Sequence, residues 1–259
     1  MSVLALQSCT DNLVYTGADI EVVLTGNTYK AAFTESSPVS TFNSGNQILL
    51  NASGSLQIDN RILTYMDNQW KAENEFSWSD ITGKTNITAL YPVYPDLDYI
   101  QENLYKNNSL EDILYVKDEF PAGNSIHLQF KHLFSLLTLY LDRDLQTNLQ
   151  KIEITCPAVS SIIPKSAEIV PADNETYTTT IAQVSPSGNY SFIVPPVKNM
   201  VIAINMVTNG KKYTTQLETK SFTGNKEYTY HLKTSEKTPG IITAEDWIAF
   251  SQLINSNTF

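Results

Sequence analysis

The alternation of apolar and polar residues is clearest between Ser125 and Leu141, near the middle of the chain. Ile126, Leu128 and Phe130 alternate with polar residues, and this two-residue period predicts a strand with one buried face. From Leu133 to Leu141 the run is almost continuously apolar, which favours a strand buried on both faces. A buried helix is the competing interpretation, because so short an apolar run has no diagnostic period. The alternating strand just before it favours the strand.

Short strand candidates separated by turn signals recur on both sides of this stretch. Residues 61–71 predict a hairpin with a tight turn at Asp67-Asn68, because Asp and Asn tolerate the left-handed backbone conformation. Asn209-Gly210 predicts a second hairpin between two strand-like flanks. Residues 161–180 are predicted to be a loop with short extended pieces. The series of strands predicts an all-β protein with two β-sandwiches, and we place the boundary between them near residue 130.

Two segments have apolar residues at helical spacing instead. Residues 96–108 predict a short helix or an ordered loop. Near the end of the chain, Thr243 is suited to cap a helix, and an apolar face follows it. Such an amphipathic helix needs a surface to cover, so it either packs on the second sandwich or begins a further module. Its apolar face contains Trp247, Phe250, Leu253 and Ile254.

The start of the chain carries a possible lipid attachment site. Leu6-Gln7-Ser8-Cys9 has the residues of a bacterial lipobox, and we predict that Cys9 receives the lipid. The alternative is a disordered or first-strand segment that contains a cysteine. The segment before Cys9 has no basic residue, and its apolar run at 3–6 is shorter than the ~7–15 residues of a signal-peptide core. The predicted segments are a truncated lipoprotein signal or anchor (1–11), an N-terminal β-sandwich (12–130), a C-terminal β-sandwich (131–235), and a linker with an amphipathic helix (236–259).

Composition and charge narrow the possible partners. Apolar residues make up 42% of the 259 residues and charged residues 17%, which suffices for a large core. The net charge of −10 repels nucleic acid and anionic lipid, so we expect neither as a partner. No apolar run reaches the ~18 residues of a transmembrane helix. Of the two cysteines, Cys156 lies in an alternating strand and is expected to be a small buried residue rather than a partner of Cys9.

No motif in the sequence predicts a catalytic, metal or cofactor site, so we expect no enzyme activity and no cofactor. His132 is interpreted as a structural residue that bonds the backbone where the two sandwiches meet. The acidic clusters are interpreted as solvated loop charges, with a weak cation site or a glycosidase pair as the alternative. These clusters are Glu111-Asp112, Asp118-Glu119 and Asp142-Arg143-Asp144.

Aromatic residues allow a second functional hypothesis, a carbohydrate-binding surface protein. Exposed rings stack on sugars, although core packing is the favoured interpretation because most of these residues occupy alternating positions. The candidates are Trp70, Trp78, Tyr91, Tyr94 and Tyr99.

Three stretches together resemble the fimbrillin family of Gram-negative anaerobes. The first is Leu63 to Pro92, with LTY, DNQW, FSWSD and NITALYP in order. The second is Asp112 to Tyr115, which leads into IHLQFKHLFSLLTLYL. The third is Ser221 to Tyr228, SFTGNKEY. Their order and spacing extend over residues 33–233, and the possible lipobox at Cys9 is consistent with the same family.

The resemblance implies two tandem transthyretin-like β-sandwiches, exported as a lipoprotein. It implies a fimbrial accessory, tip or anchor subunit at the outer membrane, held there by a lipid on Cys9. Its partners would be other fimbrial subunits or ligands on host or bacterial surfaces. Polymerising members lose their first strand to an Arg-directed protease, and a donor strand from a neighbour replaces it. Arg61 and Arg143 are the only arginines here, and neither lies in the loop after the first strands, which favours a relative that does not polymerise in this way.

Overall fold

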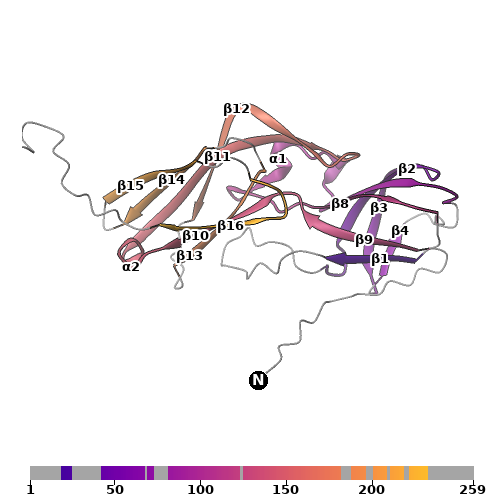
Figure 1. Cartoon of the computed structure of the whole chain (residues 1–259), viewed down its shortest axis with the longest axis horizontal. Helices are drawn as coiled ribbons and strands as arrows, with labels where there is room; N and C mark the ends of the chain where they lie inside the picture. The colour runs from indigo at the N-terminus through magenta and orange to yellow at the C-terminus, as the bar shows by residue number, and fades with distance from the viewer. Residues whose placement is uncertain are drawn as a thin grey trace, which may run out of the picture.

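The computed structural model describes residues 19–24, 42–67, 69–72, 81–122, 125–181, 188–196, 201–208, 211–218 and 222–232. Within these ranges the chain is nearly all β, as predicted (Figure 1). The first unit is a seven-stranded sheet with the strand order β1 (Asp19–Leu24), β9 (Ser125–His132), β8 (Leu114–Phe120), β5 (Thr85–Tyr91), β2 (Gln47–Gly54), β3 (Ile58–Met66) and β4 (Gln69–Ala72).

The seven-stranded sheet folds over itself between β8 and β9. These two strands pair only at Leu114 with His132 and at Tyr115 with Lys131, so they diverge beyond that corner. β9 continues with β1, which pairs with it in parallel. Side chains from β9 and from the β2–β5 side of the sheet then enclose one core, which we call the first core. It contains Leu128 and Phe130 of β9 together with Ile48, Leu50, Ala52, Leu63, Tyr65, Trp70, Ile81, Ile87, Ala89, Leu114 and Val116.

The second unit packs a three-stranded sheet against a four-stranded one (Figure 1). The smaller sheet has the order β13 (Asn189–Val194), β10 (Ser135–Leu141) and β16 (Glu227–Leu232). The larger has the order β12 (Glu168–Ile181), β11 (Leu149–Ile163), β14 (Val201–Thr208) and β15 (Lys211–Glu218). Alternate side chains of the two sheets meet in the second core, which includes Leu137, Leu139, Ile152, Ile154, Cys156, Phe192, Ile202 and Ile204.

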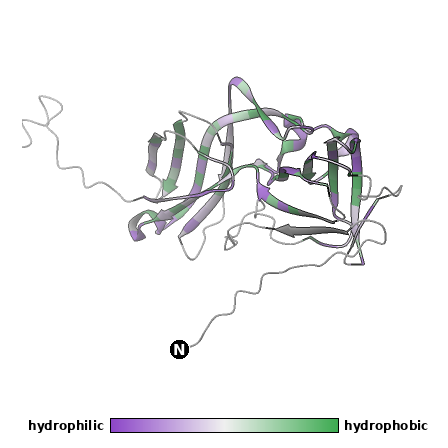
Figure 2. Cartoon of the chain, turned by 45° about the vertical axis from the view of Figure 1, so that its right-hand side comes forward, coloured by the Kyte–Doolittle hydropathy of each residue, from purple (hydrophilic) through white to green (hydrophobic). Residues whose placement is uncertain are grey.

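The predictions for the central stretch are confirmed. Leu128 and Phe130 are buried while Gln129 between them is exposed, which is the half-buried pattern expected of β9. β10 is a strand and is the middle strand of its sheet, and six of its seven residues are buried. Figure 2 colours the residues by hydropathy, and apolar and polar bands alternate along many of the strands.

Both predicted hairpins are present. Met66 pairs with Gln69 across the first turn, where Asp67 has a φ of 54° in the left-handed region. Thr208 pairs with Lys211 across the second, so two residues connect β14 and β15. Each turn therefore fixes the register of the two strands that it joins.

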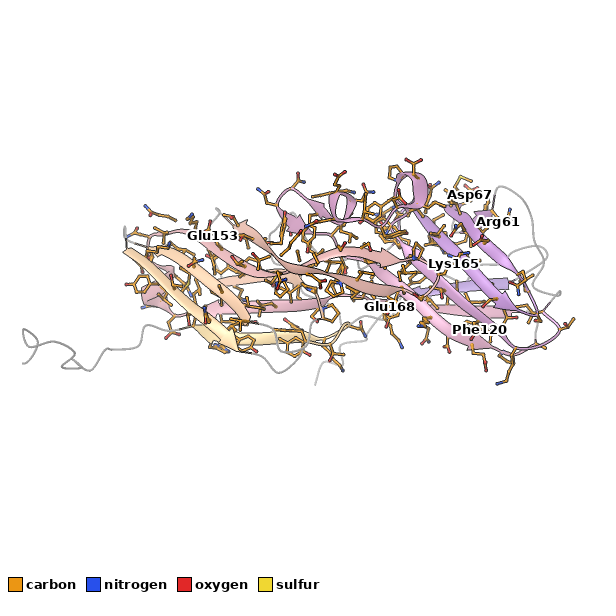
Figure 3. All side chains as sticks on the ribbon, turned by 90° about the horizontal axis from the view of Figure 1, so that it is seen from above. Arg61, Asp67, Phe120, Glu153, Lys165 and Glu168 are labelled. Atoms are coloured by element: carbon orange, nitrogen blue, oxygen red, sulfur yellow. The ribbon has the colours of Figure 1, made fainter. Side chains whose placement is uncertain are left out.

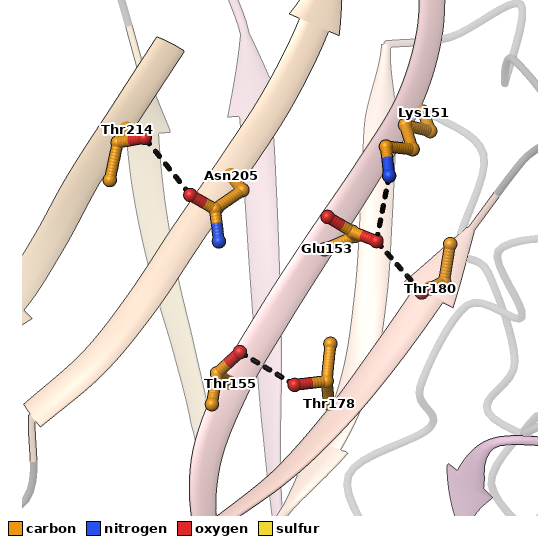
Figure 4. Close-up of polar contacts among 7 residues, drawn as sticks. All are labelled: Lys151, Glu153, Thr155, Thr178, Thr180, Asn205 and Thr214. Carbon is orange, nitrogen blue, oxygen red and sulfur yellow. Dashed lines mark hydrogen bonds and ion pairs between the residues drawn. The ribbon is translucent and has the colours of Figure 1, made fainter. Parts of the chain in front are cut away.

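The prediction of a loop at 161–180 is wrong, because most of this segment continues β11 and forms β12. Its residues lack an apolar alternation, but they pair with β11 along nearly its whole length. Polar contacts connect the two strands on their outer face: the Thr155 and Thr178 hydroxyls are 2.8 Å apart, and Thr180 donates to Glu153 over 3.4 Å (Figure 4). β12 is an edge strand, where a residue such as Pro171 is tolerated.

Residues 95–110 form a compact excursion between β5 and β8. It consists of the 3-10 helix η2 (Pro95–Leu97), the helix α1 (Gln101–Leu104), and the short paired strands β6 (Tyr105–Lys106) and β7 (Ser109–Leu110). The helix α2 (Arg143–Gln146) connects β10 to β11. None of the helices in the described ranges has the length and apolar character needed to span a membrane. Cys9, Trp78 and the predicted C-terminal helix lie outside the described residues.

Candidate functional site: the joint between the two sheet units

Stretches from distant parts of the sequence meet where the chain passes from the first unit to the second. β9 ends at His132, Leu133-Phe134 crosses over, and β10 begins at Ser135. The segment before β8 and the turn before β16 both contact this crossover. We call this region the joint. It contains two parts of the second stretch that carries the family resemblance, around Asp112 and around His132, and it brings residues 222–228 of the third stretch against them.

A buried polar pair lies at the joint. The His132 Nδ1 atom is 2.8 Å from one carboxylate oxygen of Asp112 and 3.0 Å from the other. Both side chains are almost fully buried, with exposed fractions of 6% and 5%. An ionised carboxylate only accepts hydrogen bonds, so Nδ1 carries the proton and donates. The prediction that Asp112 is a solvated loop charge is therefore wrong, and the predicted structural histidine has a carboxylate as a ring partner.

Backbone hydrogen bonds hold the crossover on both sides. The Leu133 amide donates to the Ile113 carbonyl over 2.7 Å, which attaches it to the segment before β8. The Asn225 amide donates to the Phe134 carbonyl over 2.9 Å, and the His132 amide donates to Asn225 Oδ1 over 3.3 Å. The crossover is thus bound to an upstream segment and to a downstream turn at the same place.

Gly224 shows how closely the downstream turn approaches. A Cβ atom added at Gly224 would lie 2.4 Å from the Leu133 carbonyl oxygen, a distance that real Cβ atoms essentially never show. Only glycine fits without a backbone shift. Asn225 next to it has a φ of 59°, in the left-handed region that asparagine tolerates. The Gly-Asn sequence of this turn is explained by the close contact with the crossover.

A third core surrounds the joint and contains side chains from both units. The first unit contributes from β2, β5 and the excursion, and the second from the crossover, β10, β11, β13 and the turn after β11. Its buried members are Leu49, Leu90, Tyr94, Tyr99, Leu104, Leu110, Ile113, Leu133, Phe134, Leu136, Val159, Ile162, Ala167 and Ile193.

Polar contacts fix the excursion within this third core. The Tyr94 hydroxyl donates to Glu111, and Lys106 Nζ lies 3.1 Å from Glu111 Oε2. The Tyr99 hydroxyl donates to the Pro92 carbonyl over 2.6 Å. Burial, chiefly, raises the pKa of both tyrosine hydroxyls well above the usual range. These hydroxyls therefore stay protonated and act as hydrogen-bond donors.

The turn between β11 and β12 reaches back over the first unit. Lys165 Nζ lies 2.7 Å from Asp59 Oδ1, and the Thr88 hydroxyl donates to the Lys165 carbonyl over 3.0 Å. Figure 3 shows Lys165 above the strands of the seven-stranded sheet. Further along, the Ile162 amide donates to the Tyr99 carbonyl over 2.8 Å. The long hairpin of the second unit thus contacts both the excursion and the first sheet.

An open groove of about 740 Å³ lies beside this turn, on the outer face of the first sheet. Most of its side chains are polar, and they carry charges of both signs. Among the described residues, no group of three His, Cys, Asp or Glu side chains is placed to hold a metal ion. The polar lining includes Asn51, Asp59, Asn86, Thr88, Lys117 and Lys165.

The aromatic residues considered for sugar stacking are mostly packed inside the protein. Trp70 is 1% exposed in the first core, and Tyr94 and Tyr99 are 3% and 2% exposed in the third. Tyr91 is half-buried. Buried rings have no face free for a sugar, so core packing is the role of the three buried rings. Among the other acidic clusters, Asp118 and Glu119 are exposed, as predicted, but they lie in strand β8 and not in a loop.

Cys156 is buried in the second core, as predicted, and is a free cysteine. Burial raises the pKa of its thiol to about 12. A thiol with so high a pKa is a poor nucleophile, because the thiolate is the reactive form. Cys156 is therefore a packing residue.

Comparison with known proteins identifies the protein family. The fimbrillin-like family model matches residues 29–247 of the chain. The chain belongs to the fimbrillin-like family. No curated protein sequence matches it.

Two solved structures from Bacteroides species have a similar fold. A "putative cell adhesion protein" from Bacteroides uniformis superposes with a TM-score of 0.53 at 11% identity, over 75% of this chain and 88% of the other. A second "putative cell adhesion protein", from Bacteroides ovatus, gives a TM-score of 0.52 at 13% identity, over 78% and 86%. The tip fimbrial protein Mfa3 from Porphyromonas gingivalis gives 0.47 at 9% identity, over 76% and 92%.

Proposed function

We propose that this chain is a structural or adhesive protein of the cell surface, acting as an accessory, tip or anchor subunit of a fimbrium. The observation that carries the proposal is the family match, which covers residues 29–247. Its partners would be other fimbrial subunits or ligands on host or bacterial surfaces. The paired sheets and the elongated outline in Figure 1 suit a subunit that spans distance rather than one that encloses a substrate.

The finer features of the proposal come from the sequence and the family. We propose two transthyretin-like sandwiches with a boundary near residue 130, preceded by an anchor segment and followed by a linker and helix after residue 235. A lipid on Cys9 would attach the chain to the outer membrane. The packing of sheets around a first and a second core supports the tandem arrangement.

Assembly by strand complementation is supported by the position of β1. Among the described strands, β1 lies at an edge of its sheet and pairs with β9 alone, in parallel, over six residues. Removing it would open the edge of β9 to a strand from another subunit. The scarcity of arginine favours an accessory role in which β1 stays in place, since Arg61 is in β3 and Arg143 in α2.

The test is the state of the native protein in outer-membrane and fimbrial fractions. Samples are run in SDS with and without heating and probed with an antibody to this chain. An accessory or anchor subunit that keeps β1 gives a monomer band in both samples and co-purifies with fimbrial proteins. Heat-sensitive ladders would show polymerisation by strand exchange, because release requires withdrawing a whole strand. Absence from both fractions would overturn the proposal.

The lipid anchor has its own test in a Cys9→Ala variant expressed in the native host. The variant should leave the membrane pellet and lose the mass of the lipid, whereas a Ser8→Ala variant should remain in the pellet. An unmodified Cys9 in the mature wild-type protein would refute the anchor without affecting the family assignment.

A further inference from the structure

We infer that the joint locks the two sheet units into a single unfolding unit, so that neither opens without the other. The inference rests on the geometry of the joint and holds whether or not the chain assembles into a fimbrium. A flexible linker between sandwiches would be exposed and would make few contacts. Here the crossover residues Leu133 and Phe134 are 6% and 1% exposed.

The third core is built from side chains of both units and belongs to neither unit alone. Tyr99 and Leu104 belong to the excursion of the first unit, whereas Ile162 and Ile193 belong to strands of the second. Separating the units would expose all of these side chains to water at once. The cost of exposing apolar surface grows with its area, so partial opening at the joint is unfavourable.

The crossover is attached both to a segment of the first unit and to a turn of the second. The crossover is bonded to Ile113, just before β8, and to Asn225, just before β16. The Leu136 amide also donates to the Lys226 carbonyl over 2.9 Å. Unfolding β16 would release the turn that holds the crossover, and unfolding β8 would release its other support. Loss of either unit therefore removes contacts that stabilise the other.

The β11–β12 hairpin extends from the second unit onto the first. Its turn is bonded to Asp59 and Thr88 of the first sheet. β11 also reaches the excursion, where the Val159 amide donates to the Tyr105 hydroxyl over 2.9 Å. A single hairpin thus contributes to the second core at one end and braces the first unit at the other.

The experiment follows both units during equilibrium unfolding in urea. Trp70 reports the first core by fluorescence in a variant whose Trp78 and Trp247 are replaced by Phe. Cys156 reports the second core through labelling by a thiol reagent, in a variant that also carries Cys9→Ser. A single unit gives the same midpoint for both probes, because each becomes exposed only in the common transition. Separate midpoints for Trp70 and Cys156 would overturn the inference.

Two neighbouring residues of β11 provide a matched control. Ile162 is 2% exposed in the third core, and Ile163 beside it is 43% exposed. Ile162→Ala should lower the midpoints of both probes by the same amount, and Ile163→Ala should leave both near wild type. If Ile162→Ala prevents folding, Ile162→Val serves in its place and should give a smaller common shift. A shift of the Cys156 midpoint alone would show that the third core stabilises only the second unit.

Discussion

The His132 ring donates to the Asp112 carboxylate across the joint, with 2.8 Å between Nδ1 and the nearer oxygen, although the two residues are 20 positions apart in sequence. Both side chains are buried, so water cannot take the place of this contact without a local opening of the joint. Removing one member of a buried polar pair takes away a hydrogen bond that water does not readily replace, and such losses are among the largest effects of single substitutions.

Asp112→Ala is expected to lower the free energy of unfolding by about 3 kcal/mol, because it leaves the His132 Nδ1–H group buried without this acceptor. Asp112→Asn keeps an oxygen acceptor at nearly the same position and should cost about 1 kcal/mol. Urea unfolding followed by circular dichroism measures both. Asp118→Ala, at an exposed position, is the control and should change little. Equal stability of Asp112→Ala and wild type would show that the pair is not stabilising.

Gly224→Ala is expected to destabilise the protein by about 2 kcal/mol, because the new Cβ atom would lie 2.4 Å from the Leu133 carbonyl oxygen and force the turn away from the crossover. Gly83→Ala is the matched control. Its Cβ atom would be 3.7 Å from the Ser55 Cβ atom, an ordinary contact. Thermal unfolding of the two variants tests the comparison, and a Gly224→Ala protein as stable as Gly83→Ala would contradict the close approach.

Stability should fall in alkaline solution, in part through Cys156. Its thiol has a pKa of about 12 in the folded protein and an ordinary value near 9 when unfolded. The unfolded chain therefore loses this proton first, so the contribution is fully present below pH ~9 and is lost as the pH rises toward 12. Buried tyrosines such as Tyr105, whose pKa is raised to about 12, act in the same direction. Urea midpoints measured from pH 8 to 11 should decrease, and Cys156→Ala should decrease less steeply over that range. A flat profile for the wild type would contradict the burial of these groups.

Trp70→Ala should cost about 3–5 kcal/mol, because it removes the largest buried side chain of the first core. Lys165→Ala should cost less than about 1 kcal/mol, because the ion pair with Asp59 is exposed on both sides. Urea unfolding measures the two effects side by side. Unchanged stability of Trp70→Ala together with loss of binding to a glycan array would instead favour the carbohydrate-binding hypothesis.

Strands with a clear apolar pattern and turns with characteristic residues could be predicted from the sequence. β9 and β10 follow directly from apolar alternation and from an apolar run, and the hairpin at Asn209-Gly210 follows from its turn residues. β12 was missed because its polar, Thr-rich residues form a strand only through pairing with β11. No periodic signal marks a strand that obtains its stability from a neighbour.

The joint could be predicted only in outline. The resemblance pointed to the stretches around Asp112, His132 and Gly224, but nothing in the sequence indicates that they touch. Asp112 has the sequence pattern of a loop charge. Its burial depends on the joint, which includes His132, 20 positions later, and the turn at Asn225, more than 100 positions later. Contacts of this kind depend on tertiary packing, and a single sequence carries no signal for them.

Exposure of the chain on intact cells is the most direct test of the proposal that it is a cell-surface fimbrial protein. Whole cells of the native host are treated with an external protease and then sheared, and each fraction is probed for this chain. We expect the chain to be digested on intact cells, and in untreated cells to co-purify with sheared fimbriae or with the outer membrane. Recovery of the intact chain from the soluble interior after protease treatment would contradict its assignment as a cell-surface fimbrial protein.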